Sequence, residues 1–364
     1  MGKQKNMQTN KMALLWKDVV RTLERASRTR DVVGRRMVNR FLTAGGEDEC
    51  DPYEPTLYYE EDMCKSIDCW VRQEDAEWFP RMRGRLTTER DERGRILLSV
   101  IPDDDRDLRV ENSEPVAEGG YSYLYEGFVG DEDVMVKLPK TLYGSEEDVR
   151  EIILQVSLQC ASESYPTRIA KIPRVLMLAR VDSVNLVAIQ PLEDTLKGKL
   201  RELADSKAGF RTLVRESLRQ VAELLHLLQD RMQFEHRDLH TNNVMYNIER
   251  DTFQFYIIDF GFARTVHLET GTSDRNWPKQ FIPGADLAML IIDMYGLSGH
   301  NLKFLPKGLR KPVHVLSEAL RDVVGNDSRN MWKGVYRWRD FFASIEPLVA
   351  PFTPNNVLRM IKKK

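Results

Sequence analysis

Three polar side chains in the second half of the chain have types and spacing that suit chemistry on a hydroxyl group. Asp238 and Asn243 lie five residues apart, directly before an apolar segment, and Asp259 follows the apolar residues 255–258. Such a loop can aim the Asp238 carboxylate at a hydroxyl while the amide oxygen of Asn243 holds a metal ion. A carboxylate at the end of a buried strand can bind Mg²⁺, which prefers hard oxygen ligands, and Gly261 lets the chain turn sharply beside it.

The order and separation of these residues resemble a known family. The residues lie in two runs, His236-Arg237-Asp238-Leu239-His240-Thr241-Asn242-Asn243 and Asp259-Phe260-Gly261. These runs resemble the catalytic loop and the Asp-Phe-Gly motif of the protein kinases. The resemblance implies that Asp238 accepts the proton of the substrate hydroxyl. It also implies that Asn243 and Asp259 hold Mg²⁺ against the phosphates of ATP, so that ATP and Mg²⁺ are the expected cofactors.

An upstream segment, residues 116–125, resembles the glycine-rich loop of the same family. It keeps Gly119 at the tip, followed by Gly120, whereas Ala117 and Ser122 stand where the family has its first and third glycines. Since the backbone must approach the phosphates most closely at the tip of such a hairpin, the two glycines suffice for that approach.

Lys137 ends an apolar run and resembles the lysine that contacts the α- and β-phosphates of ATP in this family. A helical segment follows, and Glu151 lies on its apolar face fourteen residues after Lys137. We expect Glu151 to form the ion pair that positions Lys137, with Glu147 one turn earlier as the alternative.

Residues 184–190 have the pattern of a buried strand, and by resemblance they lead into the hinge that contacts adenine. The carbonyl of Gln190 would accept from the adenine amine, and the N–H of Leu192 would donate to the ring. A flexible thioether adapts well to a flat ring, so we expect the adenine to lie between two sets of apolar side chains. The side chains above the ring are Leu124 and Met135, and the side chain below it is Met245.

The segment after Asp259 departs from the family pattern. No Ala-Pro-Glu run closes the stretch between Gly261 and Asp286, which is short and divergent. We expect Asp286 to be the buried aspartate that braces the backbone of the catalytic loop. The hydroxyl residues that this stretch offers for phosphorylation are Thr265, Thr270, Thr272 and Ser273.

His240 is a second departure, because Ser/Thr protein kinases typically place Lys two residues after the catalytic Asp. A His there also occurs in atypical protein kinases and in aminoglycoside- or choline-type small-molecule kinases. It could donate to phosphate with a pH dependence that Lys lacks. Arg237 and the run Phe262-Ala263-Arg264 favour the protein kinases.

Composition narrows the class of protein further. Of the 364 residues 42% are hydrophobic, so the chain can bury a core, and its net charge of −2 argues against a polybasic nucleic-acid binder. No apolar run approaches the roughly 20 residues of a membrane helix, and residues 1–40 contain no apolar core of a signal peptide, so we expect no secretion. The four cysteines are sparse enough to be free thiols. We therefore expect a soluble, intracellular monomer that has no transmembrane segment and binds no nucleic acid.

The expected architecture is α+β, a two-lobed protein-kinase-like fold with a small β-rich N-lobe, a larger helical C-lobe and an N-terminal extension. The resemblance implies transfer of the γ-phosphate of ATP to Ser or Thr of protein substrates, in a divergent enzyme reminiscent of kinases of large DNA viruses. A small-molecule kinase and a pseudokinase scaffold are the alternatives. The expected regions are a basic helical extension (1–45), an acidic linker with a β-hairpin (46–109), the N-lobe (110–192) and the C-lobe (193–364).

Overall fold

The computed structural model of the chain describes residues 58–59, 82–110, 113–119, 122–140, 146–163, 168–181, 184–265, 281–324 and 342–362. The expected basic extension, most of the acidic linker, Gly120 and three of the cysteines lie outside these ranges, as do the side chains of Glu147 and Cys160. The chain divides into unit 1 (residues 1–164 and 173–191) and unit 2 (residues 165–172 and 192–364). No described helix has the length and apolar character needed to cross a membrane.

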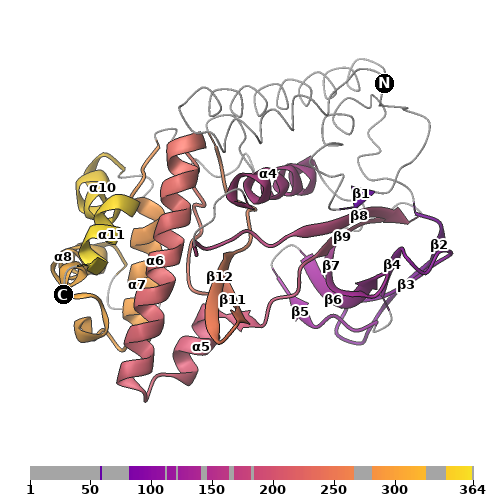
Figure 1. The fold of residues 1–364 in the computed structure, drawn as a ribbon, viewed down its shortest axis with the longest axis horizontal. Coiled ribbons are helices and arrows are strands. Elements are labelled where there is room, and N and C mark those ends of the chain that lie inside the picture. The colour runs from indigo at the N-terminus through magenta and orange to yellow at the C-terminus, as the bar shows by residue number, and fades with distance from the viewer. Residues whose placement is uncertain are drawn as a thin grey trace. The chain divides into compact units, whose positions relative to one another are not determined.

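Unit 1 contains, among its described residues, a seven-stranded antiparallel sheet (Figure 1). The strand order is β1-β8-β9-β7-β6-β4, and β5 pairs with β6. Among the described residues of this unit, helix α4 (Glu146–Glu163) follows β7 in the chain. The strands are β1 (Tyr58–Tyr59), β4 (Leu108–Arg109), β5 (Ala117–Glu118), β6 (Ser122–Val129), β7 (Glu132–Pro139), β8 (Val175–Val181) and β9 (Val184–Ile189).

The two faces of this sheet follow from the alternation of side chains along its strands. In β7 the side chains of Val134, Val136 and Leu138 are buried, whereas those of Met135 and Lys137 are half-buried. The sheet therefore packs one face into the core of unit 1 and leaves the residues on the other face accessible.

The predicted hairpin before this sheet is confirmed. Strands β2 (Gly84–Arg90) and β3 (Ile96–Pro102) pair in register around a turn at residues 91–94. Gly94 has the left-handed φ of 76° that such a turn needs. Asp91 accepts from the backbone N–H groups of Arg93 and Arg95. The buried face of β3 joins the core of the sheet, and the hydroxyl of Tyr125 donates to the carbonyl of Ile96 at 2.7 Å.

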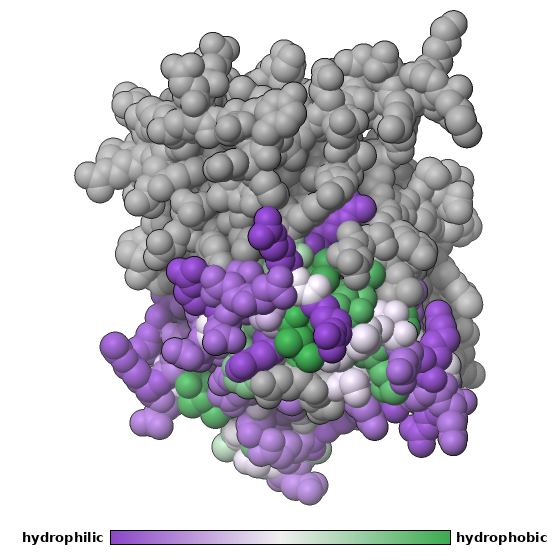
Figure 2. All heavy atoms as spheres, turned by 90° about the vertical axis from the view of Figure 1, so that its right-hand side faces the viewer, coloured by the Kyte–Doolittle hydropathy of each residue, from purple (hydrophilic) through white to green (hydrophobic). Residues whose placement is uncertain are grey.

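The outer side of the hairpin is polar. Five of the seven residues of β2 are exposed, and Ile101 of β3 is one of four exposed large apolar side chains among the described residues. Figure 2 shows a face of the molecule on which the described residues are mainly hydrophilic, with apolar residues in small groups between them. Single exposed apolar side chains are normal for a soluble protein surface.

Unit 2 contains most of the described helices and, among its described residues, a three-stranded sheet of order β10-β11-β12. Figure 1 shows its long helix α6 beside α7 and α11. The helices are α5 (Leu196–Glu202), α6 (Lys207–Met232), α7 (Ala285–Leu297), α8 (Arg310–Val324), α10 (Phe342–Val349) and α11 (Pro354–Lys362). The strands are β10 (Asp194–Thr195), β11 (Val244–Glu249) and β12 (Thr252–Ile257).

Helix α6 is amphipathic, and its buried face includes Leu213, Leu218, Val221 and Leu228. The Ser206 hydroxyl caps its first turn by accepting from the N–H of Gly209. Gln233 ends it in the left-handed conformation. His226 lies on the outer face of the helix and is exposed.

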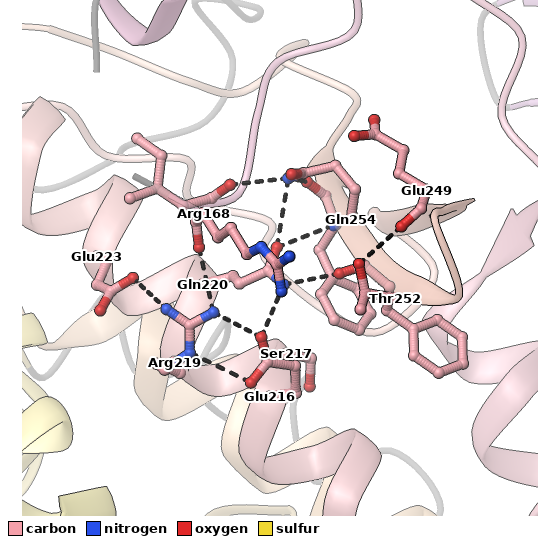
Figure 3. Close-up of polar contacts among 12 residues, drawn as sticks. Arg168, Glu216, Ser217, Arg219, Gln220, Glu223, Glu249, Thr252 and Gln254 are labelled. Carbon is pink, nitrogen blue, oxygen red and sulfur yellow. Dashed lines mark hydrogen bonds and ion pairs between the residues drawn. The ribbon is translucent and has the colours of Figure 1, made fainter. Parts of the chain in front are cut away.

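A polar network ties β12 to α6 (Figure 3). The side chain of Gln220 donates to the carbonyl of Phe253 (2.8 Å) and accepts from the N–H of Phe255 (3.1 Å). Gln254 donates to the carbonyl of Ile169 (2.7 Å), in a segment that also bridges to β12. Because these buried polar groups are paired, β12 is fixed against the longest helix of unit 2, and β12 leads into Asp259.

Arg219 forms a second group in the same region of α6. Its guanidinium contacts the carboxylates of Glu216 (2.5 Å) and Glu223 (2.7 Å) and donates to the carbonyl of Arg168 (3.2 Å) (Figure 3). These contacts stabilise the helix and its neighbouring segment.

Candidate functional site

Asp259 lies at the end of β12 with its side chain exposed to solvent. The strand before it is buried at Phe255, Tyr256 and Ile257. Asp259 has a φ of 66°, a conformation that is uncommon for a residue with a side chain and that occurs often at functional sites. The strand thus ends on an exposed carboxylate beside the turn at Gly261.

The loop that carries Asp238 is held by Asp286, as the sequence predicted. The carboxylate of Asp286, at the start of α7, accepts from the backbone N–H groups of His236 and Arg237, each at 2.8 Å. Arg237 has a φ of 65°. Asp286 is 2% exposed; burial raises the pKa of its carboxyl, and the two N–H donors oppose that shift. The loop is therefore fixed from beneath, one residue before Asp238.

Asn243 connects the other two predicted catalytic residues. Its side-chain amide donates to the backbone carbonyl of Asp238 at 2.9 Å. Its own backbone carbonyl accepts from the N–H of Ile258, the neighbour of Asp259, at 3.0 Å. Since the amide nitrogen makes the first contact, the amide oxygen is the atom that can serve as a ligand. The structure thus brings Asp238, Asn243 and Asp259 together.

His236 is buried beneath this loop and supports it. Its Nδ1 accepts from the N–H of Asp238 (3.4 Å), and its Nε2 lies 2.9 Å from the carbonyl of Ile258. This pair of contacts suits a neutral ring with the proton on Nε2. Burial lowers the pKa of His236, and its ring packs against Phe234 and Phe260. The histidine therefore links the catalytic loop to the end of β12 without carrying charge.

His240 lies beside Asp238. Its Nδ1 accepts from the N–H of Asn242 (3.2 Å), and its Nε2 lies 3.7 Å from a carboxylate oxygen of Asp238. Burial lowers the pKa of His240 to about 4. With this pKa the ring is uncharged near neutral pH, so any pH dependence that His240 contributes lies at lower pH. The charged or titratable groups that face it are Lys197, His236, Asp238, Asp259 and Asp293.

Two carboxylates that support the loop were not found from the sequence. Asp293 of α7 accepts from the N–H of Thr241 (2.9 Å) and from its hydroxyl. Glu235 accepts from the N–H of Ile282 (2.8 Å) and pairs with Arg264. Both contacts join residues that are far apart in sequence, so only a weak signal was available. For Asp293 that signal was its position two turns after Asp286 on an apolar helix.

In unit 1 the structure contains the expected ion pair. Lys137 Nζ lies 2.7 Å from Glu151 Oε1, and both side chains are partly buried. Helix α4, which carries Glu151, is held to the start of β8 by two of its glutamines. The Gln155 amide donates to the carbonyl of Pro173 (3.1 Å), and Gln159 Oε1 accepts from the N–H of Val175 (3.0 Å).

The candidate nucleotide residues of unit 1 form a row across three strands. Ala117 of β5 lies opposite Leu124 of β6, which lies opposite Lys137 of β7. Met135 is two residues from Lys137 and so shares its face. These side chains are exposed or half-buried, whereas the other face of the strands is core. The predicted residues therefore share the accessible face of the sheet.

The hairpin of β5 and β6 places Gly119 at its tip. The N–H of Gly119 donates to the carbonyl of Ser122 at 2.8 Å, which closes the turn. Beside the tip the ammonium of Lys140 pairs with Glu118, the residue before Gly119 (2.5 Å), and lies 5.0 Å from the ring centre of Tyr123. The hairpin is thus pinned next to its exposed tip.

The predicted adenine contacts are divided between the two units. Leu124, Met135 and Gln190 belong to unit 1, and Leu192 and Met245 belong to unit 2. Gln190 follows β9, and its N–H donates to the carbonyl of Arg174 at 2.8 Å. Met245 lies half-buried in β11. The adenine site remains a prediction.

The described residues contain no group of three or more His, Cys, Asp or Glu side chains arranged for a metal ion. The set that they do offer, one carboxylate from Asp259 and one amide oxygen from Asn243, consists of hard oxygen donors. Mg²⁺ in phosphoryl-transfer sites takes few protein ligands and completes its shell with phosphates and water. The donor set therefore fits that ion.

Comparison with known proteins finds similarity over the middle of the chain. Residues 175–268 match the model of the phosphotransferase enzyme family APH. The matched range includes Asp238, Asn243 and Asp259 and excludes Lys137. No curated protein matches the chain. The chain is thus similar, over this range, to a family of kinase-type phosphotransferases.

Proposed function

We propose that this protein is an ATP-dependent phosphotransferase that transfers the γ-phosphate of Mg·ATP to Ser or Thr hydroxyls of protein substrates. The observation that carries the proposal is the hydrogen-bonded connection of Asp238, Asn243 and the end of β12. It is supported by the similarity to kinase-type phosphotransferases over residues 175–268.

Asp238 is the proposed acceptor of the substrate proton. The carboxylate is held by its loop, whose backbone is bonded to Asp286, His236 and Asn243. A fixed base needs no reorganisation when the hydroxyl attacks, and positioning of this kind lowers the barrier. The Nε2 of His240 lies 3.7 Å from this carboxylate, beyond hydrogen-bond distance, and the neutral ring leaves the negative charge of Asp238 in place.

Asn243 and Asp259 are the proposed ligands of Mg²⁺, which would neutralise charge that develops on the phosphates. Lys137, held by Glu151, is the proposed contact to the phosphates. The row formed by Ala117, Leu124 and Lys137 supplies the accessible strand face against which the nucleotide would lie.

Protein substrates are favoured by the length of chain between the hinge and the catalytic loop. A small-molecule kinase usually builds its substrate pocket from a helical insertion there. In this chain β10, α5 and α6 occupy almost all of residues 194–232, so the stretch contains no additional helix. The presence of Lys137, Asp238, Asn243 and Asp259 argues against a scaffold without activity.

A small-molecule substrate is the second candidate, and the family match favours it. The matched family is described as phosphotransferase enzymes, without restriction to protein substrates. His240 next to the catalytic Asp is also compatible with aminoglycoside- or choline-type kinases.

One experiment separates the two candidates. Wild-type protein and Asp238→Asn are incubated with γ-labelled ATP and Mg²⁺, with casein, a basic protein, an aminoglycoside and choline offered in parallel. We expect label on serine or threonine of the proteins with the wild type and none above background with Asp238→Asn. Label on the small molecules alone would replace the first candidate with the second.

A further inference from the structure

A buried cluster of four charged side chains lies directly beside the catalytic loop, and the proposed transfer chemistry does not use it. Its members come from three segments of unit 2: the catalytic loop, the segment after β12 and the first turn of α7. They are Glu235, Arg237, Arg264 and Asp286.

Glu235 is the member that makes the most connections. Its Oε1 accepts from the N–H of Ile282 at 2.8 Å. Its Oε2 pairs with the Nε of Arg264 and lies 3.7 Å from the Nε of Arg237. Its backbone also pairs with that of Arg264 in both directions, at 2.9 and 2.8 Å. Glu235 therefore contacts Arg264, which directly precedes residues 265–281, and Ile282, which directly follows them. It also contacts Arg237, the arginine next to Asp238.

The charges of this cluster balance within it. Glu235 and Asp286 contribute two carboxylates, and Arg237 and Arg264 contribute two guanidiniums. All four side chains are buried or nearly so. An isolated charge in such surroundings is costly, and an arginine cannot give up its proton to avoid that cost. The two arginines thus have their counter-charges built into the fold.

Glu235 contacts the residues on both sides of the stretch 265–281. Residues 265–281 begin directly after Arg264 and end directly before Ile282, so both flanks of this stretch are bonded to the same carboxylate. The stretch contains the hydroxyl residues that the sequence offers for phosphorylation. A phosphate can order such a stretch by pairing with arginines, but here the two arginines at its base are already paired with carboxylates.

We propose that Glu235 is a positioning residue whose carboxylate holds Arg237 and both flanks of residues 265–281, so that the catalytic loop is in its working arrangement without phosphorylation of that stretch. The inference rests on the proposed phosphotransferase function and adds how its site is regulated. Glu235 acts through Arg237 and through the backbone at residues 264 and 282. It does not contact the substrate.

The first test uses the variant Glu235→Gln, which keeps the shape of the side chain and an oxygen for the N–H of Ile282 but removes the negative charge. We expect kcat to fall at least tenfold while the dissociation constant of ATP stays within twofold of the wild type. Glu216→Gln is the matched control, because Glu216 also pairs with an arginine in unit 2 but lies on α6 (Figure 3). Its kcat should stay within twofold.

A second variant separates the counter-charge from a merely structural role. Glu235→Gln leaves the cluster with one excess positive charge, and the double variant Glu235→Gln/Arg264→Gln restores neutrality. We expect the kcat of the double variant to be at least threefold higher than the kcat of Glu235→Gln. Losses that simply multiply would overturn the proposal, as would a Glu235→Gln enzyme as fast as the wild type.

The proposed independence from phosphorylation is tested on wild-type protein that has been treated with phosphatase and verified by intact mass to carry no phosphate. We expect its kcat to stay within twofold of the untreated protein, and a tenfold loss would overturn the proposal. The Asp238→Asn variant is measured in the same assay. If it turns over as fast as the wild type, the proposed function fails; if it is inactive while Glu235→Gln is unimpaired, only the role of Glu235 fails.

Discussion

The side-chain amide of Asn243 donates to the backbone carbonyl of Asp238 at 2.9 Å, and the backbone carbonyl of Asn243 accepts from the residue before Asp259. Asn243 therefore has two roles in the proposed site. Its side-chain nitrogen fixes the loop that carries the proposed base. Its side-chain oxygen is the atom proposed to bind Mg²⁺, a role that the chemistry of the donor set supports.

Asn243→Ala removes both roles at once. We expect kcat to fall by roughly a hundredfold or more, because the base loses its position and the metal loses a ligand. The Mg²⁺ concentration for half-maximal activity should also rise. Steady-state rates over a Mg²⁺ titration measure both effects, and circular dichroism checks that the variant is folded. An unchanged Mg²⁺ requirement would contradict the assignment of Asn243 as a ligand.

Asp286→Ala tests the brace beneath the loop. The substitution leaves the buried N–H groups of His236 and Arg237 without their acceptor and removes a counter-charge from the cluster. Loss of one partner from a buried charged group typically costs about 3 kcal/mol. We expect the free energy of unfolding in urea to fall by roughly this amount, with activity lost in parallel. Wild-type stability would show that the two hydrogen bonds contribute little.

The lowered pKa of His240 predicts a dependence of stability on pH. Burial lowers it from 6.5 to about 4, so between these values the unfolded chain binds a proton that the folded chain does not. The resulting stabilisation is complete above pH 6.5 and is lost as the pH falls toward 4.

The measurement compares urea unfolding of wild type and His240→Gln at pH 7.5 and pH 5.0, without nucleotide or Mg²⁺. The free energy of unfolding of the wild type should fall by about 1–2 kcal/mol more than that of the variant between the two pH values. His236, whose pKa is also lowered by burial, is present in both proteins and cancels. Equal losses in the two proteins would mean that His240 titrates normally in the folded state.

Lys137 and Glu151 should be energetically coupled, because their side chains meet at 2.7 Å on the accessible face of the sheet. We expect Lys137→Met to lower kcat/KM for ATP by at least a hundredfold, Glu151→Gln to lower it by about tenfold, and the double variant to be no worse than Lys137→Met alone. A double-mutant cycle on kcat/KM makes this comparison. Fully multiplicative losses would indicate that the two residues act independently.

Elements with a local signal were predictable from the sequence. The turn at residues 91–94, the strand that ends at Asp259 and the helix around residues 213–228 each depend on patterns within a few residues. The brace at Asp286 was also predicted, although it lies 50 residues from His236, because the resemblance to the kinases assigns an aspartate to that place.

Contacts without such a signal were missed. The contacts of Glu235 with Arg264 and Ile282 depend on the packing of segments that lie far apart in the sequence. No local pattern distinguishes Glu235 from a surface glutamate. The low pKa of His240 likewise results from burial, which the sequence does not reveal.

The most direct test of the account is the transfer of labelled phosphate from γ-labelled ATP by wild type and Asp238→Asn, in the presence of Mg²⁺ and the protein substrate that the wild type labels best. The account predicts transfer by the wild type and a loss of at least a thousandfold in Asp238→Asn, with ATP binding retained. Transfer by Asp238→Asn at the rate of the wild type would contradict the assignment of the catalytic loop and the function proposed from it.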